Sequence, residues 1–157
     1  MQNRMMKFTL DSDSVERVLT DSAVGRISTI GADGYPYTVS VHYWYDGSAI
    51  YFHGLPKGEK LDNIKANPKV CFEVSSMKSI LAPEDERNIC TADTEYESVV
   101  IRGKAYIMEK RTEKKPVLEK IVEKYLPGAN NPMPEKRIDG TAVVKIIIEN
   151  KTGKYHR

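Results

Sequence analysis

The sequence predicts a mainly β fold, in which six antiparallel strands form a closed or nearly closed barrel with a few peripheral helices. Apolar and polar residues alternate with a period of two in several segments of the chain, which is the pattern of half-buried strands. Successive strands are arranged as antiparallel pairs rather than as βαβ units. Closure of such a sheet into a barrel removes the exposed strand edges that it would otherwise have.

Six segments carry the strand pattern, and short turns join the first three into a meander. The first turn contains Gly34, which can adopt a positive φ, and Asp46-Gly47 favours a hairpin after the second strand. Gly103 in the fifth strand predicts a bulge or a close approach of two backbones. The predicted strands are residues 25–30, 37–45, 49–53, 70–74, 96–108 and 141–149.

Three segments carry a helical pattern. In the first, Asp13 and Glu16 resemble a capping box, and in the third, Pro116 is tolerable only near the first turn. Residues 77–93 show no clean period and are predicted to form a long loop, a kind of segment that is usually functional or mobile. The predicted helices are residues 13–22, 59–66 and 112–126, and a second loop is predicted over residues 127–139.

Length and composition narrow the function classes. The 157 residues suit a single domain spanning 1–157, and 24 basic against 22 acidic side chains are too balanced to favour nucleic acid as a partner. No stretch approaches the roughly 18 apolar residues of a membrane span, and the N-terminus lacks the apolar core of a signal peptide. We therefore expect a cytoplasmic protein. Cys71 and Cys90 have no metal-ligand or redox spacing, so no metal site is predicted.

The most informative segment runs from His53 to Lys60. A strand ends at His53, a loop containing glycine and proline follows, and a helix opens near Gly58. Amide groups at a helix N-terminus attract anions, and Lys57 and Lys60 add positive charge while His53 adds a donor. The segment predicts a phosphate site, although surface lysines beside a helix are more often merely solvated.

Two further segments could contact a ligand. The backbone of residues 38–41 could donate and accept hydrogen bonds along the edge of a flat heterocycle, or the segment could be an ordinary barrel strand. Tyr96 and Ser98 are two residues apart on one strand and therefore share a face, which could meet a ligand or solvent. Among the histidines, His53 is the one we expect to be functional, because it adjoins the glycine-containing loop.

The order of these segments resembles the pyridoxamine 5′-phosphate oxidase-like flavoprotein superfamily, and within it the 5-nitroimidazole reductase branch most closely. The resemblance covers nearly the whole chain and depends on the order and spacing of several motifs. These motifs are Gly25-Arg26-Ile27-Ser28-Thr29, Gly34 to Val41, Asp46-Gly47, Ile50-Tyr51-Phe52-His53, Gly58-Glu59-Lys60-Leu61, Asn67 to Phe72, Tyr96-Glu97-Ser98-Val99, Gly103-Lys104-Ala105 and Thr152-Gly153-Lys154.

The resemblance implies a split β-barrel that forms a homodimer and binds two FMN molecules between its subunits. In this family pattern Lys60 contacts the FMN phosphate, and His53 lies by the flavin and is linked to activity. The cofactor-binding residues that it implies are Thr38, Val39, Ser40 and Val41 along the isoalloxazine edge, Phe52 and His53 near Lys60, and Tyr96, Ser98 and Val99 from this chain or its partner. Lys57 adds charge beside the phosphate.

The expected function is that of an oxidoreductase that passes electrons from NAD(P)H through FMN to a small acceptor of the nitroaromatic kind. Pyridoxamine phosphate is not expected as the substrate, because Glu59 replaces the arginine that precedes the phosphate-binding lysine in those oxidases, and no C-terminal arginine clamp is evident. A non-enzymatic flavin-binding or storage protein is the alternative. Deazaflavin or haem in place of FMN, and a barrel without a cofactor, also stay open.

Overall fold

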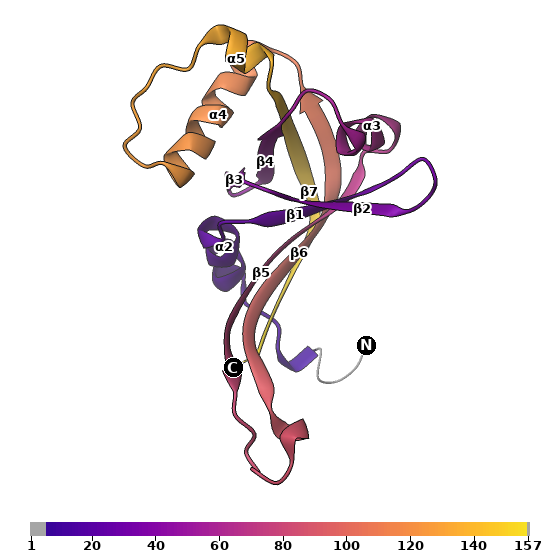
Figure 1. Ribbon diagram of the computed structural model, residues 1–157, viewed down its shortest axis with the longest axis vertical. Coiled ribbons are helices and arrows are strands. Elements are labelled where there is room, and N and C mark those ends of the chain that lie inside the picture. Colours follow the sequence, from indigo (N-terminus) through magenta and orange to yellow (C-terminus); the bar gives the residue numbers. More distant parts are fainter. Residues whose placement is uncertain (1–5, 157) are drawn as a thin grey trace.

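The computed structural model describes residues 6–156 and consists of one antiparallel sheet that curls into a half-barrel, with helices around it (Figure 1). The mainly β prediction is confirmed, but the described residues contain seven strands rather than six. The strands are β1 (Gly25–Ile30), β2 (Pro36–Val41), β3 (Tyr43–Tyr45), β4 (Ala49–Gly54), β5 (Lys69–Leu81), β6 (Asp93–Met108) and β7 (Ala142–His156). The helices are α2 (Ser12–Asp21), α3 (Glu59–Ala66), α4 (Arg111–Tyr125) and α5 (Glu135–Asp139), with a 3-10 turn η1 (Ile89–Thr91).

The seventh strand arises because the predicted strand 37–45 is broken at His42. The sheet order is β2-β1-β5-β6-β7-β4-β3, so β2 and β3 lie at its two ends although a single residue joins them. The sheet must therefore curl until its ends meet. The sequence gives no sign of this break. Val41 before it and Tyr43 after it both face the core, so the alternation of apolar and polar residues is uninterrupted.

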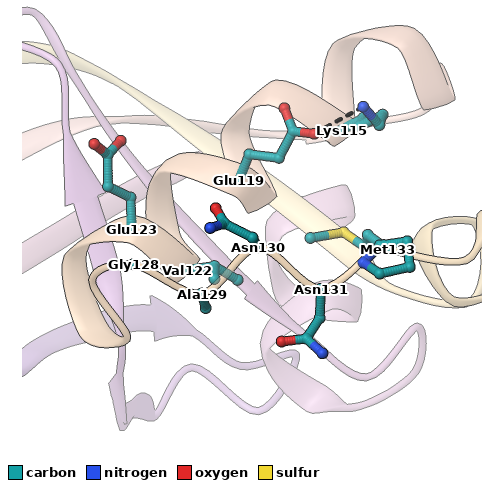
Figure 2. A pocket seen from close by; sticks show the side chains of 10 residues that line it. Lys115, Glu119, Val122, Glu123, Gly128, Ala129, Asn130, Asn131 and Met133 are labelled. Atoms are coloured by element: carbon teal, nitrogen blue, oxygen red, sulfur yellow. Dashed lines mark ion pairs between the residues drawn. The ribbon is translucent and has the colours of Figure 1, made fainter.

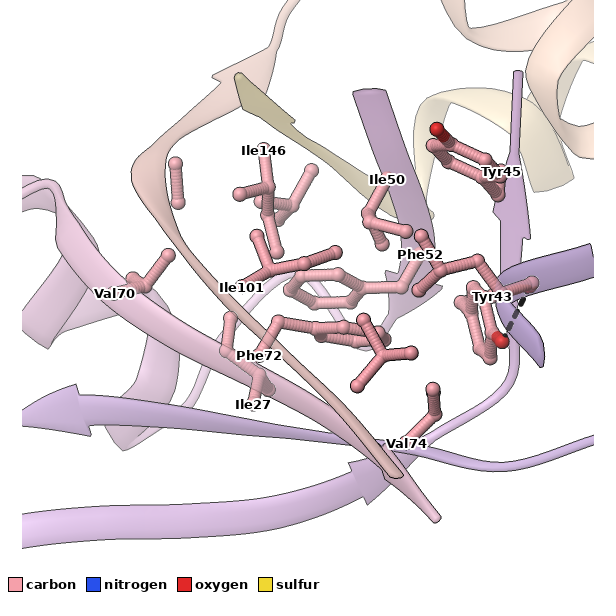
Figure 3. Close-up of a cluster of buried hydrophobic side chains, with 14 of the residues drawn as sticks. Ile27, Tyr43, Tyr45, Ile50, Phe52, Val70, Phe72, Val74, Ile101 and Ile146 are labelled. Carbon is pink, nitrogen blue, oxygen red and sulfur yellow. Dashed lines mark hydrogen bonds between the residues drawn. The ribbon is translucent and has the colours of Figure 1, made fainter. Parts of the chain in front are cut away.

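The interior of the curl holds the main hydrophobic core (Figure 3). Ile27, Phe52, Phe72, Ile101 and Ile146 come from five different strands and are fully buried. Helices α2 and α3 add apolar side chains to the same cluster. Each large side chain buried in this way contributes roughly 1.5–3 kcal/mol, so this core carries much of the folding energy.

A second apolar cluster lies on the outer side of the sheet, under α4 and α5. Ala49, Tyr51 and Val143 of β4 and β7 pack there against Leu118 and Ile121 of α4. Ala142, Val144 and Ile146 of β7 face the main core instead, so the first residues of this strand are buried on both faces of the sheet. Pro116 lies inside α4 rather than in its first turn, because the helix already begins at Arg111.

The prediction of a loop over residues 77–93 is wrong at both ends, where residues 77–81 and 93 belong to strands, whereas residues 82–92 do connect them. β5 continues to Leu81 and pairs there with Asp93 of β6, and η1 occupies the connection. The two strands form an arm that extends away from the barrel (Figure 1). Met77 and Ile80 are 69% and 66% exposed, so β5 has no buried face in the arm that would impose a period of two on its sequence.

Smaller differences follow from local geometry. Helix α2 is capped by Asp11, whose Oδ1 accepts the Ser14 amide at 2.7 Å, and not by Asp13. Part of the predicted loop 127–139 folds as α5, and β7 continues beyond residue 149 to pair with the arm. The bulge at Gly103 is confirmed by a shift in register between Arg102 and Gly103. No helix of residues 6–156 has the length and apolar character needed to span a bilayer.

Candidate functional site

The connection from β4 to α3 forms the predicted anion site. Gly58 is the N-cap of α3 and has a φ of 136°, a value that side chains rarely tolerate. As a glycine it offers no side chain to cap the helix. The first amides of α3 therefore stay available to an outside acceptor, and an anion is the acceptor that the helix dipole favours.

Lys60 folds back from the first turn of α3 onto the end of β4. Its Nζ lies 3.4 Å, and its Cε 3.6 Å, from the position that a Cβ on Gly54 would occupy. The lysine stem thus packs over Gly54, at a distance that leaves no room for a side chain larger than alanine. No carboxylate of the described residues forms an ion pair with this ammonium group, so its charge is available to a ligand. Lys57 is exposed in the same loop.

His53 is next to this site on β4. It pairs with Val143 of β7, and its side chain is exposed on the outer side of the sheet. Partial burial lowers the pKa of His53, and the nearby charge of His42 lowers it further. His53 is therefore a neutral imidazole at neutral pH, and it can either donate or accept a hydrogen bond.

Residues Thr38 to Val41 lie on β2, which is an end strand of the sheet and pairs with β1 alone among the described strands. Its second edge is free to bond a ligand through backbone N–H and C=O groups. Val39 and Val41 pack partly against the core, whereas Thr38 and Ser40 are exposed. The hydroxyl groups of Thr38 and Ser28 are 2.7 Å apart and hydrogen-bonded to each other.

The site residues predicted on β6 lie far from Lys60 in the fold. Tyr96 and Ser98 are half-buried in the part of β6 that leads to the arm. Lys104, which pairs with Lys69 just after α3, is six residues from Ser98 along the strand, or roughly 20 Å at the usual rise. One chain therefore does not bring the two groups of predicted residues together.

Two predicted side chains face the core. Phe52 and Val99 are fully buried in the main cluster, so any contact that they make with a ligand must come from their backbone. Gly54 is the residue whose role sequence reasoning did not single out. A glycine directly after a strand and six residues before a lysine could have indicated it, whereas Tyr125, which stacks on His42, gives no local signal.

The surface also has a separate hollow of about 650 Å³ between α4 and residues 128–133 (Figure 2). Glu119 and Glu123 of α4 face Asn130 and Met133 across it. None of the predicted site residues lines this hollow, so it is distinct from the site at Gly54 and Lys60.

The geometry can be compared with known proteins. The model of the family described as pyridoxamine 5′-phosphate oxidase matches residues 11–155. The chain belongs to this family. The match includes β1 to β7 and the connection from β4 to α3, and it confirms the resemblance inferred from the motifs. No curated protein sequence matches the chain.

Several solved structures share the family fold. A candidate 5-nitroimidazole antibiotic resistance protein from Bacteroides thetaiotaomicron has a TM-score of 0.81 and 22% identity over 93% of this chain and 85% of its own. The flavocytochrome Anf3 from Azotobacter vinelandii has a TM-score of 0.86 and 20% identity, covering 100% of this chain and 72% of its own. A FAD-binding protein from Mesorhizobium loti has a TM-score of 0.67 and 25% identity, covering 95% and 97%.

Proposed function

We propose that this protein binds FMN and works as an oxidoreductase that passes electrons from NAD(P)H to a small acceptor, of the nitroaromatic class. The observation that supports the proposal is the position of Lys60, which packs over Gly54 at the start of α3. There its ammonium group, which forms no ion pair with a described residue, lies beside the first amides of the helix. A phosphate monoester carries about −1.5 to −2 charges near neutral pH, which such a donor set matches.

The donors present fit a flavin mononucleotide. Lys60 and the first amides of α3 would hold the phosphate, with Lys57 adding charge from the loop. Glu59 is exposed and can turn its carboxylate to solvent, where salt screens its repulsion of the phosphate. The free edge of β2 would hold the polar rim of the ring system through backbone groups of residues 38–41.

The relatives support a redox function of this kind. A flavocytochrome and a FAD-binding protein share this fold, and so does a candidate 5-nitroimidazole resistance protein. FMN, when bound, accepts a hydride from a reduced nicotinamide and passes the electrons on. The chain would orient that cofactor, and the neutral imidazole of His53 would hydrogen-bond to an acceptor beside it.

The site is proposed to be shared between two copies of the chain. Tyr96, Ser98 and the backbone of Val99 lie too far along β6 to meet Lys60 of the same chain. A second copy could supply them, because the arm that carries them projects from the barrel (Figure 1). The complete site would therefore exist in a homodimer.

The first test is the absorbance spectrum of the purified protein, which should show bound flavin. Lys60→Ala should weaken FMN binding roughly 10- to 100-fold, since a hydrogen bond to a charged group contributes about 1.5–3 kcal/mol. Lys65→Ala is the matched control, because Lys65 lies on the same helix and pairs only loosely with Asp62 at 3.7 Å. Equal affinity in the Lys60 and Lys65 variants would refute the phosphate site.

A non-enzymatic flavin carrier is the second candidate. One observation supports it: among the predicted site residues, His53 is the single histidine and no carboxylate is present, which leaves little acid–base chemistry. Anaerobic addition of NADH or NADPH separates the two functions. Bleaching of the flavin within seconds supports the oxidoreductase, and an unchanged spectrum supports the carrier.

A further inference from the structure

Two histidines lie near each other on the outer side of the sheet, although the sequence separates them by eleven positions. The antiparallel ladder of β3 and β4 ends at the pair of Tyr43 and Phe52. His42 and His53 are the residues adjacent to this last pair, so they are neighbours across the end of the ladder. Cross-strand neighbours have Cβ atoms about 4.5–5.5 Å apart, so their imidazole rings can face each other. His53 precedes Gly54, against which Lys60 is seated.

The His42 ring is held in place from α4. It stacks on Tyr125 with ring centroids 4.3 Å apart and an angle of 24° between the planes. The Tyr125 hydroxyl accepts the Tyr43 amide at 2.9 Å and donates to Ala23 O at 2.8 Å or Tyr43 O at 3.1 Å. These bonds fix the tyrosine to both β3 and the α2–β1 connection, so the histidine stacked on it has a rigid support.

We propose that His42 is a positioning residue for His53: stacked on Tyr125, it holds a second imidazole beside His53 on the acceptor side of the proposed flavin site. The inference rests on the proposed function, because it assigns His53 to the acceptor side of that site. A neutral imidazole retains both a donor and an acceptor nitrogen, whereas an imidazolium ion can only donate.

Among the groups around His53, His42 is the one whose electrostatic interaction lowers the pKa of His53. On the β7 side, His53 pairs with Val143, which has no charge. On α4, Lys124 is directed elsewhere, since its Nζ donates to Ser22 O at 2.9 Å and lies 4.0 Å from the centre of the Tyr43 ring. Lys60 approaches from α3, but its ammonium lies at Gly54 and is placed for the phosphate.

The pKa of His53 agrees with this arrangement. Burial lowers it first, and the electrostatic interaction with His42 lowers it further. Removal of the titratable ring at position 42, with the stacking and the burial retained, should therefore raise the pKa of His53.

The experiment is an NMR titration of the His53 ring in the full chain, with and without FMN. His42→Phe keeps an aromatic ring on Tyr125 but removes the charge, so the pKa of His53 should rise. His42→Lys restores a charge and should lower it again. An unchanged pKa of His53 in His42→Phe, or a pKa in His42→Lys as high as in His42→Phe, would overturn the proposal.

A kinetic readout connects this coupling to turnover. If neutral His53 serves the acceptor, kcat/KM falls as the pH drops through the pKa of His53, and in His42→Phe that fall should begin at a higher pH. A merely structural role for His42 would lower activity at every pH without moving the profile. The titration does not require flavin, so a colourless protein would refute the proposed function and still leave the coupling measurable.

Discussion

The space above Gly54 decides where the charge of Lys60 is placed. A Cβ there would make an ordinary contact with the lysine, at 3.4 Å from Nζ, whereas the two further methyl groups of valine would occupy its path. We expect Gly54→Ala to bind FMN nearly as the wild type does and Gly54→Val to bind it roughly tenfold more weakly, through loss of a charged hydrogen bond. Fluorescence titration with FMN measures both.

Thermal melts give the control for this pair. Valine suits a strand, so the melting temperature without FMN should be the same in both variants. Equal FMN affinity of the alanine and valine variants would mean that Lys60 does not have to pack over position 54 in order to bind the phosphate.

His53 also makes stability depend on pH. Its pKa is lowered on folding, so the unfolded chain binds the proton more readily than the folded chain does. The free energy of unfolding should therefore fall as the pH drops below about 6.5, the ordinary pKa of histidine. In His53→Gln that part of the loss should disappear from urea melts between pH 7.5 and 5.5, and an identical slope in both proteins would contradict the assignment.

At the scale of single residues, the sequence could single out Lys60 and His53, because each adjoins a glycine-containing loop at the end of an element. The structure brings Lys60 to Gly54, the residue after His53, and their role at a flavin stays a prediction. Phe52 and Val99 were expected at the flavin, and their side chains lie in the core. Neighbouring residues of a strand face opposite sides, so an exposed His53 already requires a buried Phe52.

Among the elements, the bulge in β6 allows no side chain. A Cβ on Gly103 would lie 2.2 Å from the carbonyl oxygen of Ile147, which belongs to the paired backbone and cannot turn away. Gly103→Ala should lower the free energy of unfolding by roughly 1–3 kcal/mol. Val100→Ala, at an exposed position of the same strand, should change it by less than about 0.5 kcal/mol. Urea denaturation of the two variants is the measurement.

The hairpin of β3 and β4 depends on Asp46. Its Oδ1 accepts the amides of Ser48 and Ala49 at 2.8 and 2.7 Å, and its Oδ2 accepts the Tyr51 hydroxyl at 2.9 Å. Burial raises the pKa of this carboxyl, but these bonds outweigh it, so the pKa is lowered. Asp46→Ala should therefore cost roughly 1–2 kcal/mol at neutral pH.

The acid dependence of that loss has a definite sign. A lowered carboxyl pKa adds stability above its ordinary value of 3.8, and this stability is lost as the pH falls through the folded-state pKa. The two proteins should thus become more similar in urea melts as the pH approaches 3. Asp33→Ala is the control, because Asp33 accepts only the Tyr35 amide, at 3.0 Å, in the neighbouring turn.

Elements with one buried face were predictable, and those without one were not. β1, β4 and α3 lie close to their predicted bounds, since the core imposes their period. In the arm, β5 is exposed on both faces, so its sequence carries no such period and resembles that of a loop. The break at His42 could not be predicted for a different reason. Val41 and Tyr43 both face the core, so the alternation continues across the break.

For the whole molecule, a shared site predicts complementation between two defective chains. Lys60→Ala and the double variant Tyr96→Ala/Ser98→Ala should each bind FMN poorly alone. After unfolding and refolding together, mixed dimers contain one site with both halves intact, so about a quarter of the sites should recover in a two-fold dimer. No recovery, or a monomeric mass in light scattering, would refute a site built from two chains.

The single residue between β2 and β3 limits how the barrel can deform. Two Cα steps span at most about 7 Å, so the two ends of the sheet cannot separate further than that at His42. The gap between β2 and β3 can therefore widen only toward Pro36, while its end at His42 stays fixed. A ligand bound along β2 would therefore twist the backbone at His42. That rotation would change the position of His42 relative to the imidazole of His53 without the movement of any loop.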